Sequence, residues 1–380
     1  MKIAIIHPFF LAIGGGEKLA SVVASIYPDA DIKCLLHSHE VVSDILKGRN
    51  ITAMGINRFP LKYKWYRYGL PIYPIAVENI DLRNYDLIIT SDSSIMKGVL
   101  VNQDATHVCY CHSPMRCLWD LYQEYCENMN FITRPIFKLG SHYVRQFDFQ
   151  AAQRVDRFAA NSAYIQQRIQ KYYGRSSTVL YGPVETSNGY IAKNHDDYYL
   201  SVGRLVYQKR IDLLIQACNV LKRRLIIAGT GREMPYLRSI SGPTIKFIGY
   251  IPDNKLPKLY AECRALLFAA DEDLGLVPIE AQSCGRPVVA YEHGGALETV
   301  RVNSGKGNDT GVFFKDRTVD SIVNAIRQFE SIEQHFIPEE IKLYASQFDV
   351  SIFKNRFKDF IDETLANRNQ RWYRNNFEFK

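Results

Sequence analysis

Short apolar runs of strand character alternate with helical patterns along this chain, and the alternation is repeated in its second half. In the first half, the runs that we expect to form strands are 2–6, 32–36, 87–90, 107–111, 157–160 and 178–181. In the second half, they are 198–202, 224–228, 245–248, 265–269, 287–291 and 310–313. Helical patterns separate nearly all of them, which is typical of parallel sheets covered by helices. The sequence therefore predicts an α/β fold with two parallel sheets.

A polar segment without helical or strand periodicity lies between the two halves. Its sequence, GPVETSNGYIAKNHDD over residues 182–197, is broken by proline and glycine, as interdomain linkers are. With 380 residues, of which 47% are hydrophobic, the chain can bury two cores. We therefore predict an N-terminal domain, a linker, a C-terminal domain, and a C-terminal helix and tail that crosses back to the first domain, over residues 1–184, 185–197, 198–348 and 349–380.

Cysteine usage and the N-terminal sequence favour a cytoplasmic protein. The eight cysteines form no Cys-x-x-Cys pair, so we expect free thiols in a reducing compartment. The start MKIAIIHPFF has one lysine and an apolar run broken by His7 and Pro8, which predicts a first strand rather than a signal peptide. The apolar runs fall short of the roughly 20 residues that cross a bilayer. A net charge of +7 with both signs interspersed favours an anionic ligand or surface.

Cys109, Cys111 and His112 raise the question of a zinc site. Alternation along the expected strand directs both cysteine side chains to one face, which core packing explains as well as metal ligation does. We favour core packing and predict no metal site there.

The segment 271–295, DEDLGLVPIEAQSCGRPVVAYEHGG, sets two glutamates on either side of a glycine turn. Before it, the apolar run 265–269 predicts a buried strand. Gly275 permits a sharp turn, and Pro278 suits the first position of a helix that runs to Cys284. This order predicts a strand, a turn and a helix N-terminus in direct succession.

The two glutamates would flank the N-terminus of that helix. Glu272 leaves the strand end, and Glu280 falls in the first turn of the helix. Between them, the free amides of Leu276 and Val277 can hold an anion. Acceptors for hydroxyl groups beside donors for phosphate are what a nucleoside-diphosphate sugar requires. General-acid and nucleophile roles, as in glycoside hydrolysis, are the alternative for these glutamates.

Arg204 and Lys209 are the cations that we expect beside this pocket. Arg204 follows the expected strand 198–202, and Lys209 lies near the start of the next helix, so both can reach the crevice at the carboxyl ends of the strands. Arginine offers a fixed fork of donors and lysine a point charge, and both suit a departing diphosphate. Taken alone, each would be a solvated surface residue. Beside the glycine turn and the paired glutamates, we favour phosphate binding.

Three successive glycines, 14–16, follow the first strand and precede a helical run over 17–26. Their amides can form an anion-binding nest, although a turn that needs positive φ explains them equally well. His112 precedes Pro114 at the rim of the first sheet, where packing or capping is the alternative to a catalytic role.

Five segments, taken together, resemble glycosyltransferase family 4, the retaining enzymes of GT-B fold. In chain order they are Gly14-Gly-Gly-Glu-Lys, Cys111-His-Ser-Pro-Met-Arg-Cys-Leu-Trp-Asp, Ser201-Val-Gly-Arg-Leu followed by Lys209, Glu272-x7-Glu280, and Gly294-Gly-Ala-Leu-Glu298-Thr-Val. The resemblance extends over nearly the whole chain and is greatest to the bacterial mannosyltransferase branch. It implies two Rossmann-like parallel-sheet domains that face each other across a cleft. Two positions depart from that branch, Leu274 where an aromatic residue is usual and Phe147 where tryptophan is commoner.

The resemblance implies roles for residues of both domains. Catalytic roles fall on His112, Arg204, Lys209 and Glu272. The donor-binding set is Gly15, Gly16, Gly203, Arg204, Lys209, Glu272, Leu274, Gly275, Leu276, Val277 and Glu280. Glu280 would bind the ribose hydroxyls, and Glu272 a sugar hydroxyl. The acceptor side, in an expected helix, would be formed by Arg116, Trp119 and Asp120, although a core role for Trp119 remains open.

The implied activity is retaining transfer of α-mannose from GDP-mannose to a hydroxyl of a lipid-linked glycan acceptor, in bacterial surface polysaccharide assembly. Asp271 and Asp273 form an Asp-x-Asp that could bind a metal, but Arg204 and Lys209 can replace a metal's charge. We therefore predict no metal and no other cofactor. The alternatives are a UDP-sugar donor carrying glucose or N-acetylglucosamine, a UDP-sugar 2-epimerase, and a non-catalytic partner subunit of the same fold.

The segment from Arg58 to Ile75, RFPLKYKWYRYGLPIYPI, gathers four basic and six aromatic residues without an acidic one. Such a composition suits an anionic membrane interface, so we expect peripheral contact at the inner face of the cell membrane. An ordinary helix with a partly buried aromatic face is an equal alternative. No nucleic-acid fold signature accompanies these basic residues, and we expect no nucleic-acid partner.

Overall fold

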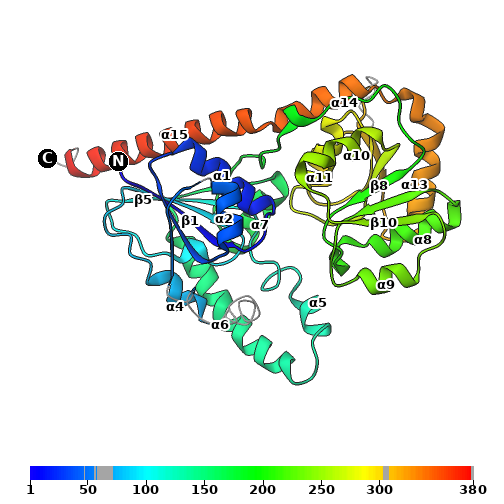
Figure 1. The fold of residues 1–380 in the computed structure, drawn as a ribbon. Helices are drawn as coiled ribbons and strands as arrows, with labels where there is room; N and C mark the ends of the chain where they lie inside the picture. Colours follow the sequence, from blue (N-terminus) through cyan, green and yellow to red (C-terminus); the bar gives the residue numbers. More distant parts are fainter. Residues whose placement is uncertain (47, 55–56, 58–71, 303–307, 378–380) are drawn as a thin grey trace. The chain divides into compact units, whose positions relative to one another are not determined.

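The chain folds into two compact units (Figure 1). The computed structural model of the protein describes residues 1–46, 48–54, 57, 72–302 and 308–377. Unit 1 comprises Met1–Gly182 and Phe353–Lys380, and unit 2 comprises Pro183–Ile352. Most of the basic aromatic segment, residues 58–71, lies outside the described residues.

Unit 1 is built on a seven-stranded parallel sheet with the strand order β3-β2-β1-β4-β5-β6-β7. The strands are β1 (Ile3–Phe10), β2 (Asp31–His37), β3 (Ile51–Ala53), β4 (Leu87–Asp92), β5 (Thr106–Cys111), β6 (Arg157–Ala160) and β7 (Ser177–Val179). The order reverses between β1 and β4. Such a switch point is typical of a doubly wound, Rossmann-like sheet.

Unit 2 is built on a six-stranded parallel sheet with the strand order β10-β9-β8-β11-β12-β13. The strands are β8 (Tyr199–Val202), β9 (Leu225–Ala228), β10 (Ile245–Gly249), β11 (Ala265–Phe268), β12 (Val288–Tyr291) and β13 (Gly311–Phe314). Here the order reverses between β8 and β11. The expected fold class, two Rossmann-like parallel-sheet units, is confirmed.

Helices follow most of the strands, as the alternating pattern predicts. Those of unit 1 are α1 (Gly15–Ile26), α2 (His39–Leu46), α4 (Tyr73–Glu78), α5 (Tyr122–Glu127), α6 (Thr133–Gln153) and α7 (Ala163–Tyr173). Those of unit 2 are α8 (Ile211–Leu221), α9 (Met234–Ser239), α10 (Leu256–Glu262), α11 (Leu276–Ser283), α12 (Ala296–Thr299), α13 (Val319–Ile332) and α14 (Pro338–Ala345). Among the helices of the described ranges, we find none with the length and apolar character that crossing a bilayer requires.

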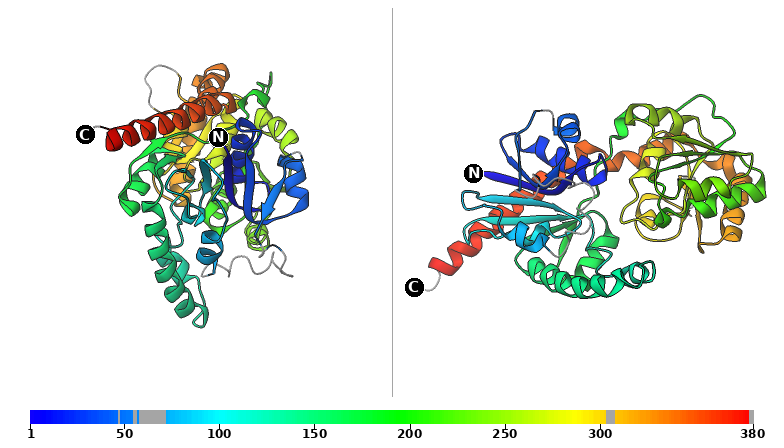
Figure 2. Two further views of the ribbon diagram at one scale, coloured as in Figure 1. Left: turned by 90° about the vertical axis from the view of Figure 1, so that its left-hand side faces the viewer. Right: turned by 60° about the horizontal axis from the view of Figure 1, so that its bottom comes forward.

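Helices cover both faces of each sheet (Figures 1 and 2). Because side chains alternate along a strand, neighbouring residues of one strand enter different apolar clusters. In β1, Ile5 packs in the cluster of α1, whereas Ala4 and Ile6 pack in that of α4 and α6. In β11, Leu267 packs in the cluster of α8 and α13, whereas Leu266 packs in that of α10 and α11. Each unit thus has its own core on both sides of its sheet.

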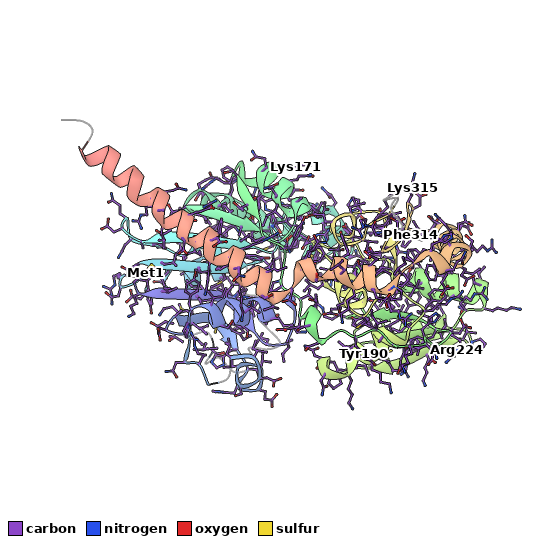
Figure 3. All side chains as sticks on the ribbon, turned by 90° about the horizontal axis from the view of Figure 1, so that it is seen from above. Met1, Lys171, Tyr190, Arg224, Phe314 and Lys315 are labelled. Carbon is purple, nitrogen blue, oxygen red and sulfur yellow. The ribbon has the colours of Figure 1, made fainter. Side chains whose placement is uncertain are left out.

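The last helix, α15 (Val350–Phe377), packs along unit 1, as the view from above shows (Figure 3). Its residues Phe353, Phe357 and Phe360 are at most 3% exposed and join the apolar cluster of β1 and α1. The aromatic ring of Tyr110, in β5, contacts Phe353 and Phe357. The C-terminal part of the chain therefore completes the core of the N-terminal unit.

Strand β1 is longer than the sequence predicts, because it continues through His7 and Pro8 to Phe10. Pairing with β4 ends at Ile6, so the missing N–H of Pro8 costs no hydrogen bond on that side. Pairing with β2 continues through His7 and Phe10. The short β3 is absent from the sequence prediction, since its three residues form no recognisable apolar run.

The eight cysteines are thiols rather than members of disulfide bonds. Cys109 and Cys111 of β5 are at most 1% exposed and belong to one apolar cluster with Phe158 and Ile169. Core packing, rather than metal ligation, therefore explains this pair of cysteines.

Candidate functional site

The loops after β8 and β11 carry most of the residues predicted to bind a donor. These strands are neighbours at the switch point of the unit 2 sheet. Gly203 and Arg204 follow β8, and Glu272 follows β11. Because parallel strands end at the same edge of a sheet, the fold brings these residues together from separate parts of the sequence.

Lys209 and Glu272 face each other at this edge. Lys209 ends the short 3₁₀ turn η4 (Tyr207–Lys209), and its Nζ forms an ion pair with Oε1 of Glu272. The two side chains are 24% and 23% exposed. Arg204, in the loop before η4, is exposed to solvent. An ammonium and a carboxylate side by side, with a guanidinium nearby in the chain, offer a ligand both donors and acceptors.

Helix α11 begins directly after Gly275, whose φ of 84° lies in the left-handed region that glycine adopts readily. The helix spans Leu276–Ser283, so Pro278 is its third residue and the predicted start at Pro278 is wrong. Proline is tolerated there because amides of the first turn have no intrahelical partner. The amides of Leu276 and Val277 belong to the same first turn, at the end of the helix that attracts anions.

Glu280 lies in the second turn of α11 and not in the first, because the helix starts at Leu276. Its Oε2 accepts a hydrogen bond of 2.7 Å from the hydroxyl of Tyr260 on α10. Tyr260 is 2% exposed, and its burial, together with the charge of Glu280, raises the pKa of the phenol well above its usual value. The phenol therefore stays protonated and holds the carboxylate in place. Sequence reasoning missed Tyr260, since no local pattern links it to Glu280.

The turn at Gly294 and Gly295 supports the loop that carries Glu272. The amide of Gly295 donates to the backbone oxygen of Glu272 at 2.8 Å. A Cβ on Gly295 would lie 2.3 Å from the Cα of Leu274, so any side chain there would displace the loop. Leu274 is 4% exposed, and its side chain packs inside the unit. The two ends of the segment 271–295 are therefore in direct contact, and each holds the backbone of the other in place.

Asp271 is held by two side chains of unit 2. Its Oδ1 lies 3.0 Å from Nδ1 of His293, and its Oδ2 lies 3.5 Å from the guanidinium of Arg317. Asp271 thus ties its loop to the loops after β12 and β13. Within the described part of the chain, no group of three or more His, Cys, Asp or Glu residues is arranged to hold a metal ion.

In unit 1, His112 ends a chain of polar contacts that begins at the N-terminus of α1. Its Nε2 lies 2.8 Å from Oγ of Ser91, which lies 3.1 Å from Nδ1 of His7. Nε2 of His7 lies 4.0 Å from Glu17, and Glu17 accepts a hydrogen bond of 3.1 Å from the amide of Gly14. The fold therefore connects the predicted catalytic histidine with the glycine segment.

Helix α1 begins at Gly15, so Gly15 and Gly16 lie in its first turn and the predicted start at Glu17 is wrong. A Cβ on Gly16 would come within 3.4 Å of the His7 ring and 3.8 Å of Nε2 of His112. Burial, together with the nearby charge of His7, lowers the pKa of His112 to about 4. His112 is therefore a neutral imidazole at pH 7, packed close to the first turn of α1.

The three residues predicted for the acceptor side lie in turns before α5, and the expected helix there is wrong. Nε of Arg116 donates to Asp120 at 3.0 Å, and Asp120 also pairs with Arg168 of α7. Arg168 is 5% exposed and donates to Oγ of Ser113 at 3.0 Å. These bonds hold the segment that follows His112 against α7, because a turn without helical hydrogen bonds needs side-chain anchors.

Trp119 is anchored by a buried charge cluster that the sequence did not reveal. Its Nε1 donates to Asp148 of α6 at 2.8 Å. Asp148 also pairs with Lys97, whose Nζ lies 3.1 Å from Asp92, and all three charged residues are at most 1% exposed. Burial alone would lower the pKa of Lys97, but Asp148 and Asp92 raise it well above its usual value, so the ammonium stays charged. The cluster supports the core role for Trp119.

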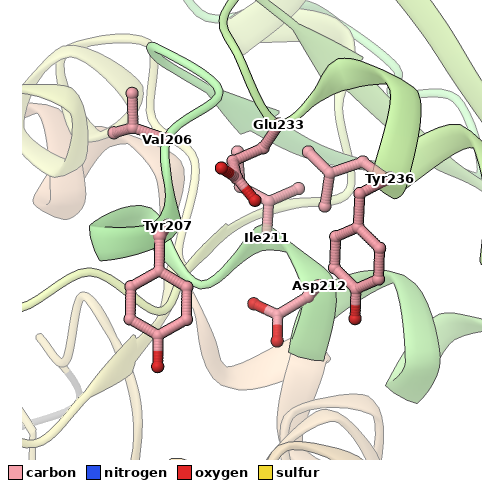
Figure 4. A pocket seen from close by; sticks show the side chains of 7 residues that line it. Val206, Tyr207, Ile211, Asp212, Glu233 and Tyr236 are labelled. Carbon is pink, nitrogen blue, oxygen red and sulfur yellow. The ribbon is translucent and has the colours of Figure 1, made fainter. Parts of the chain in front are cut away.

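A cavity of about 200 Å³ lies beside the loop that carries Lys209 (Figure 4). It is lined by Val206, Tyr207, Ile211, Asp212, Glu233, Tyr236 and Leu237. Asp212 accepts two hydrogen bonds, of 3.0 and 2.9 Å, from Arg210. Arg210 has a φ of 50°, a left-handed conformation that is uncommon for a residue with a side chain. The lining includes none of the residues predicted to bind a donor.

Two family models match this chain. The model of Glycosyltransferase Family 4 matches residues 13–188, and the model of Glycosyl transferases group 1 matches residues 185–346. The first match lies almost wholly in unit 1 and the second lies in unit 2.

Several named proteins are similar in sequence. The GDP-mannose-dependent alpha-(1-6)-phosphatidylinositol monomannoside mannosyltransferase of Mycobacterium tuberculosis is 32% identical over 33% of this chain and 36% of its own length. The O-antigen chain mannosyltransferase B of Escherichia coli is 33% identical over 34% of this chain and 36% of its own length. The alpha-1,3/1,6-mannosyltransferase ALG2 of Saccharomyces cerevisiae is 24% identical over 79% of this chain and 71% of its own length. The match thus spans about a third of the first two proteins.

Solved structures of similar fold cover nearly the whole chain. The Anabaena protein HepE, in complex with UDP, has a TM-score of 0.71 at 19% identity, over 96% of this chain and 100% of its own. A sucrose-phosphate synthase from Thermosynechococcus elongatus has a TM-score of 0.71 at 14% identity, over 97% of this chain and 100% of its own. At these identities the likeness establishes the fold alone.

Proposed function

Because this chain belongs to glycosyltransferase family 4, we propose that it transfers α-mannose from GDP-mannose to a hydroxyl group of a glycan acceptor, with retention of configuration. The observation that carries this proposal is the grouping of Lys209, Glu272 and the N-terminus of α11 at the switch point of the unit 2 sheet. A sugar diphosphate needs cations and amides for its phosphates and carboxylates for its hydroxyls. The relative named for GDP-mannose supports mannose as the sugar.

In this proposal the diphosphate lies at the N-terminus of α11. The amides of Leu276 and Val277 donate to phosphate oxygens, and Arg204 and Lys209 add positive charge. Negative charge grows on the diphosphate as its bond to the sugar breaks, so the two cations act most strongly in the transition state. The acceptor oxygen bonds to the anomeric carbon on the face that the phosphate leaves, and the departing phosphate takes the acceptor proton.

The two glutamates would orient the donor at its ends. Glu280, held by Tyr260, accepts from the ribose hydroxyls, and Glu272 accepts from a hydroxyl of the transferred sugar. The ion pair with Lys209 offsets the charge of Glu272. A donor that places its phosphate near Lys209 and its sugar near Glu272 would keep both charges paired.

We assign to His112 a contact with the donor sugar. Its lowered pKa, about 4, makes it a neutral hydrogen-bond partner for a hydroxyl at pH 7 rather than a cation. Gly15 and Gly16 belong to the same proposed contact region, because a Cβ on Gly16 would crowd this imidazole.

We propose that catalysis needs no metal ion. Arg204 and Lys209 supply the positive charge that a metal would bring to the diphosphate. Asp271, the first residue of the Asp-x-Asp, is committed to His293 and Arg317. Transfer should therefore proceed at full rate after dialysis against a chelator, and activity that disappears there and returns with manganese would show this assignment to be wrong.

We propose a lipid-linked glycan as the acceptor and the cytoplasmic face of the membrane as the place of reaction. The mycobacterial relative named for a phosphatidylinositol mannoside and the Escherichia coli relative named for an O-antigen chain support this acceptor class. The segment from Arg58 to Ile75 remains a proposed contact with anionic lipid on its composition alone.

The deciding experiment is thermal stabilisation by a panel of nucleotides and nucleotide sugars without added metal, with Glu280→Gln as the matched variant. A specific ligand raises the unfolding temperature by linkage, by an amount that depends on its affinity. Shifts with GDP and GDP-mannose that are weaker in Glu280→Gln would support the donor and its pocket together. Shifts with UDP ligands alone would replace mannose by a UDP-sugar donor, or point to a 2-epimerase. No shift with any ligand would favour a non-catalytic subunit.

A further inference from the structure

Four side chains of unit 1 form a polar row that runs from His112, at the end of β5, to Glu17 on α1. Ser91 of β4 lies between two imidazoles, with its Oγ 2.8 Å from Nε2 of His112 and 3.1 Å from Nδ1 of His7 on β1. The other ring nitrogen of His7, Nε2, lies 4.0 Å from Oε1 of Glu17. His7 and Ser91 are 4% and 1% exposed, so the fold encloses the middle of the polar row. His112 itself is partly exposed.

The hydroxyl of Ser91 gives the polar row a direction. A hydroxyl has one hydrogen to donate, and a neutral imidazole has one N–H and one acceptor nitrogen. Burial, with the nearby charge of His7, lowers the pKa of His112 to about 4 and keeps this ring neutral. Ser91 therefore donates to one of its two histidines and accepts from the other. The direction of the row decides which ring nitrogen of His112 carries the hydrogen.

The carboxylate of Glu17 selects one of the two directions. Burial alone would raise the pKa of Glu17, but the neighbouring His7 lowers it below its usual value, so the carboxylate stays charged. Its Oε2 accepts a hydrogen bond of 3.1 Å from the amide of Gly14. Because a carboxylate attracts a hydrogen and can only accept, the ring hydrogen of His7 is favoured on Nε2, beside Glu17. Nδ1 of His7 then accepts from Ser91, which accepts from Nε2 of His112.

We propose that Glu17 is a positioning residue for His112. Acting through His7 and Ser91, it holds the ring hydrogen of His112 on Nε2 and leaves Nδ1 as a hydrogen-bond acceptor. The consequence for the substrate rests on the proposed function, in which His112 contacts the donor sugar. A sugar hydroxyl can donate to Nδ1, whereas a carboxylate or an ionised phosphate oxygen cannot.

NMR of protein with isotope-labelled histidine reads the ring hydrogen directly, because protonated and unprotonated imidazole nitrogens resonate in separate regions of the spectrum. The full chain is measured at about pH 8, where an imidazole of ordinary pKa is neutral, and His112→Gln assigns the signals of His112. We expect its hydrogen on Nε2. The spectrum is recorded without a donor, so an error in the proposed donor or reaction leaves this result unchanged.

The test variant is Glu17→Gln, which keeps the shape of the side chain. Its oxygen can retain the hydrogen bond from the amide of Gly14, and its NH₂ group then takes the place of Oε1 beside Nε2 of His7. An NH₂ group donates, so the hydrogen of His7 should move to Nδ1 and the direction of the polar row should reverse. We expect the hydrogen of His112 to move from Nε2 to Nδ1 in this variant.

The control is Glu78→Gln, which removes another carboxylate of unit 1, one that pairs with Arg154 at 3.1 Å. In this variant the hydrogen of His112 should stay on Nε2. A hydrogen on Nδ1 in the wild type would overturn the inference. The same ring nitrogen protonated in the wild type and in Glu17→Gln would overturn it as well.

Ser91→Ala interrupts the polar row without changing Glu17, and so tests the inference even if Glu17→Gln does not fold. Nε2 of His112 then loses the hydroxyl that accepts its hydrogen, and the signals of both ring nitrogens should shift toward the average of the two forms. Unchanged signals of His112 in Ser91→Ala would contradict a role for the row.

Kinetics separate action through the polar row from a structural role. We expect Glu17→Gln and Ser91→Ala each to lower kcat/KM for GDP-mannose about tenfold, as for one lost hydrogen bond, at an unchanged unfolding temperature. The double variant should be no slower than Ser91→Ala alone, because Glu17 acts through Ser91. Losses that multiply in the double variant would show that Glu17 acts independently of Ser91 and would overturn the assignment.

Discussion

Lys209 and Glu272 neutralise each other beside the first-turn amides of α11. About a quarter of each side chain is exposed, and ion pairs in such settings contribute roughly 0–1 kcal/mol to stability. Removing one partner of the pair should therefore change the free energy of unfolding little. If the pair serves the donor, the same removal should change turnover greatly, which separates a binding role from a structural one.

Substitution of Lys209 tests that separation. We expect Lys209→Met to lower kcat by about 10²–10³, because a charge that meets the departing diphosphate acts mainly in the transition state. The unfolding temperature should move by no more than a few degrees. Steady-state kinetics with GDP-mannose and calorimetry measure both quantities. The control is Lys258→Met, which breaks a more exposed ion pair of unit 2, at 3.8 Å from Glu262. Equal kcat in the two variants would remove Lys209 from the proposed mechanism.

Tyr260 should act through Glu280. The Tyr260→Phe variant removes only the hydroxyl that holds the carboxylate at 2.7 Å, so we expect KM for the donor to rise roughly 5- to 10-fold, with kcat less affected, as for one lost hydrogen bond. Tyr199→Phe is the matched control, since this tyrosine is 1% exposed and donates to Glu330 at 2.9 Å elsewhere in unit 2. Both variants should lose about 1 kcal/mol of stability. A raised KM in both would reduce Tyr260 to a packing residue.

At the scale of elements, β5 positions two histidines that stay neutral. His107 is fully buried within the strand, and its Nε2 lies 3.1 Å from the hydroxyl of Thr90. Burial is the main cause that lowers the pKa of His107 to about 3, and burial with the charge of His7 lowers that of His112 to about 4. Charging either imidazole inside the fold is therefore unfavourable.

Unit 1 should consequently lose stability as the pH falls below about 6.5, the pKa of an unfolded histidine. Between that pH and about 4, the unfolded chain binds protons that folded His107 and His112 do not, and each costs about 1.4 kcal/mol per pH unit. Denaturant unfolding at intervals from pH 7.5 to 5 measures the slope. The His112→Gln variant should retain about half of it. A wild-type stability that is level over this range would contradict the burial of neutral imidazoles.

The sequence predicts these elements better than the contacts between them. Apolar runs locate the strands because burial on both faces demands them, and among the strands of the described residues only three-residue β3 lacks such a run. Pro278 and Glu17 each misplace a helix start, because both residues are tolerated inside a first turn as well as at its first position. The sequence does not explain the surroundings of Phe147. In the structure, its ring packs against Gly98, where an added Cβ would lie 2.3 Å from the ring.

The candidate site likewise contains residues that the sequence predicts and residues that it does not. Residues on the loops after β8 and β11 are predictable, because strand ends at a switch point converge in any doubly wound sheet. Tyr260 and Asp148 are not predictable, because each forms its hydrogen bond with a residue far away in the sequence, and such a pair leaves no periodic pattern. The buried cluster around Lys97 shows why. Its members look like ordinary surface charges until the fold places them at most 1% exposed.

At the scale of the whole molecule, each unit has a core of its own, and the chain returns from unit 2 to unit 1 through α15. Two cores need not unfold together, so the two units can give two thermal transitions, each with its own unfolding temperature. A ligand that binds one unit raises only the transition of that unit, unless the units are coupled. If the donor binds unit 2, calorimetry should therefore show a raised transition temperature for unit 2.

Two matched core truncations show which thermal transition belongs to which unit. Phe357 on α15 and Phe329 on α13 are both 0% exposed, in the cores of unit 1 and unit 2 respectively. Phe357→Ala and Phe329→Ala should each cost about 3–5 kcal/mol and lower a different calorimetric transition. Saturating GDP-mannose should then raise the transition that Phe329→Ala lowers, because Lys209, Glu272 and Glu280 lie in unit 2. If the ligand instead raises the transition that Phe357→Ala lowers, the donor binds unit 1. If one transition responds to both variants, the units unfold as a single cooperative body.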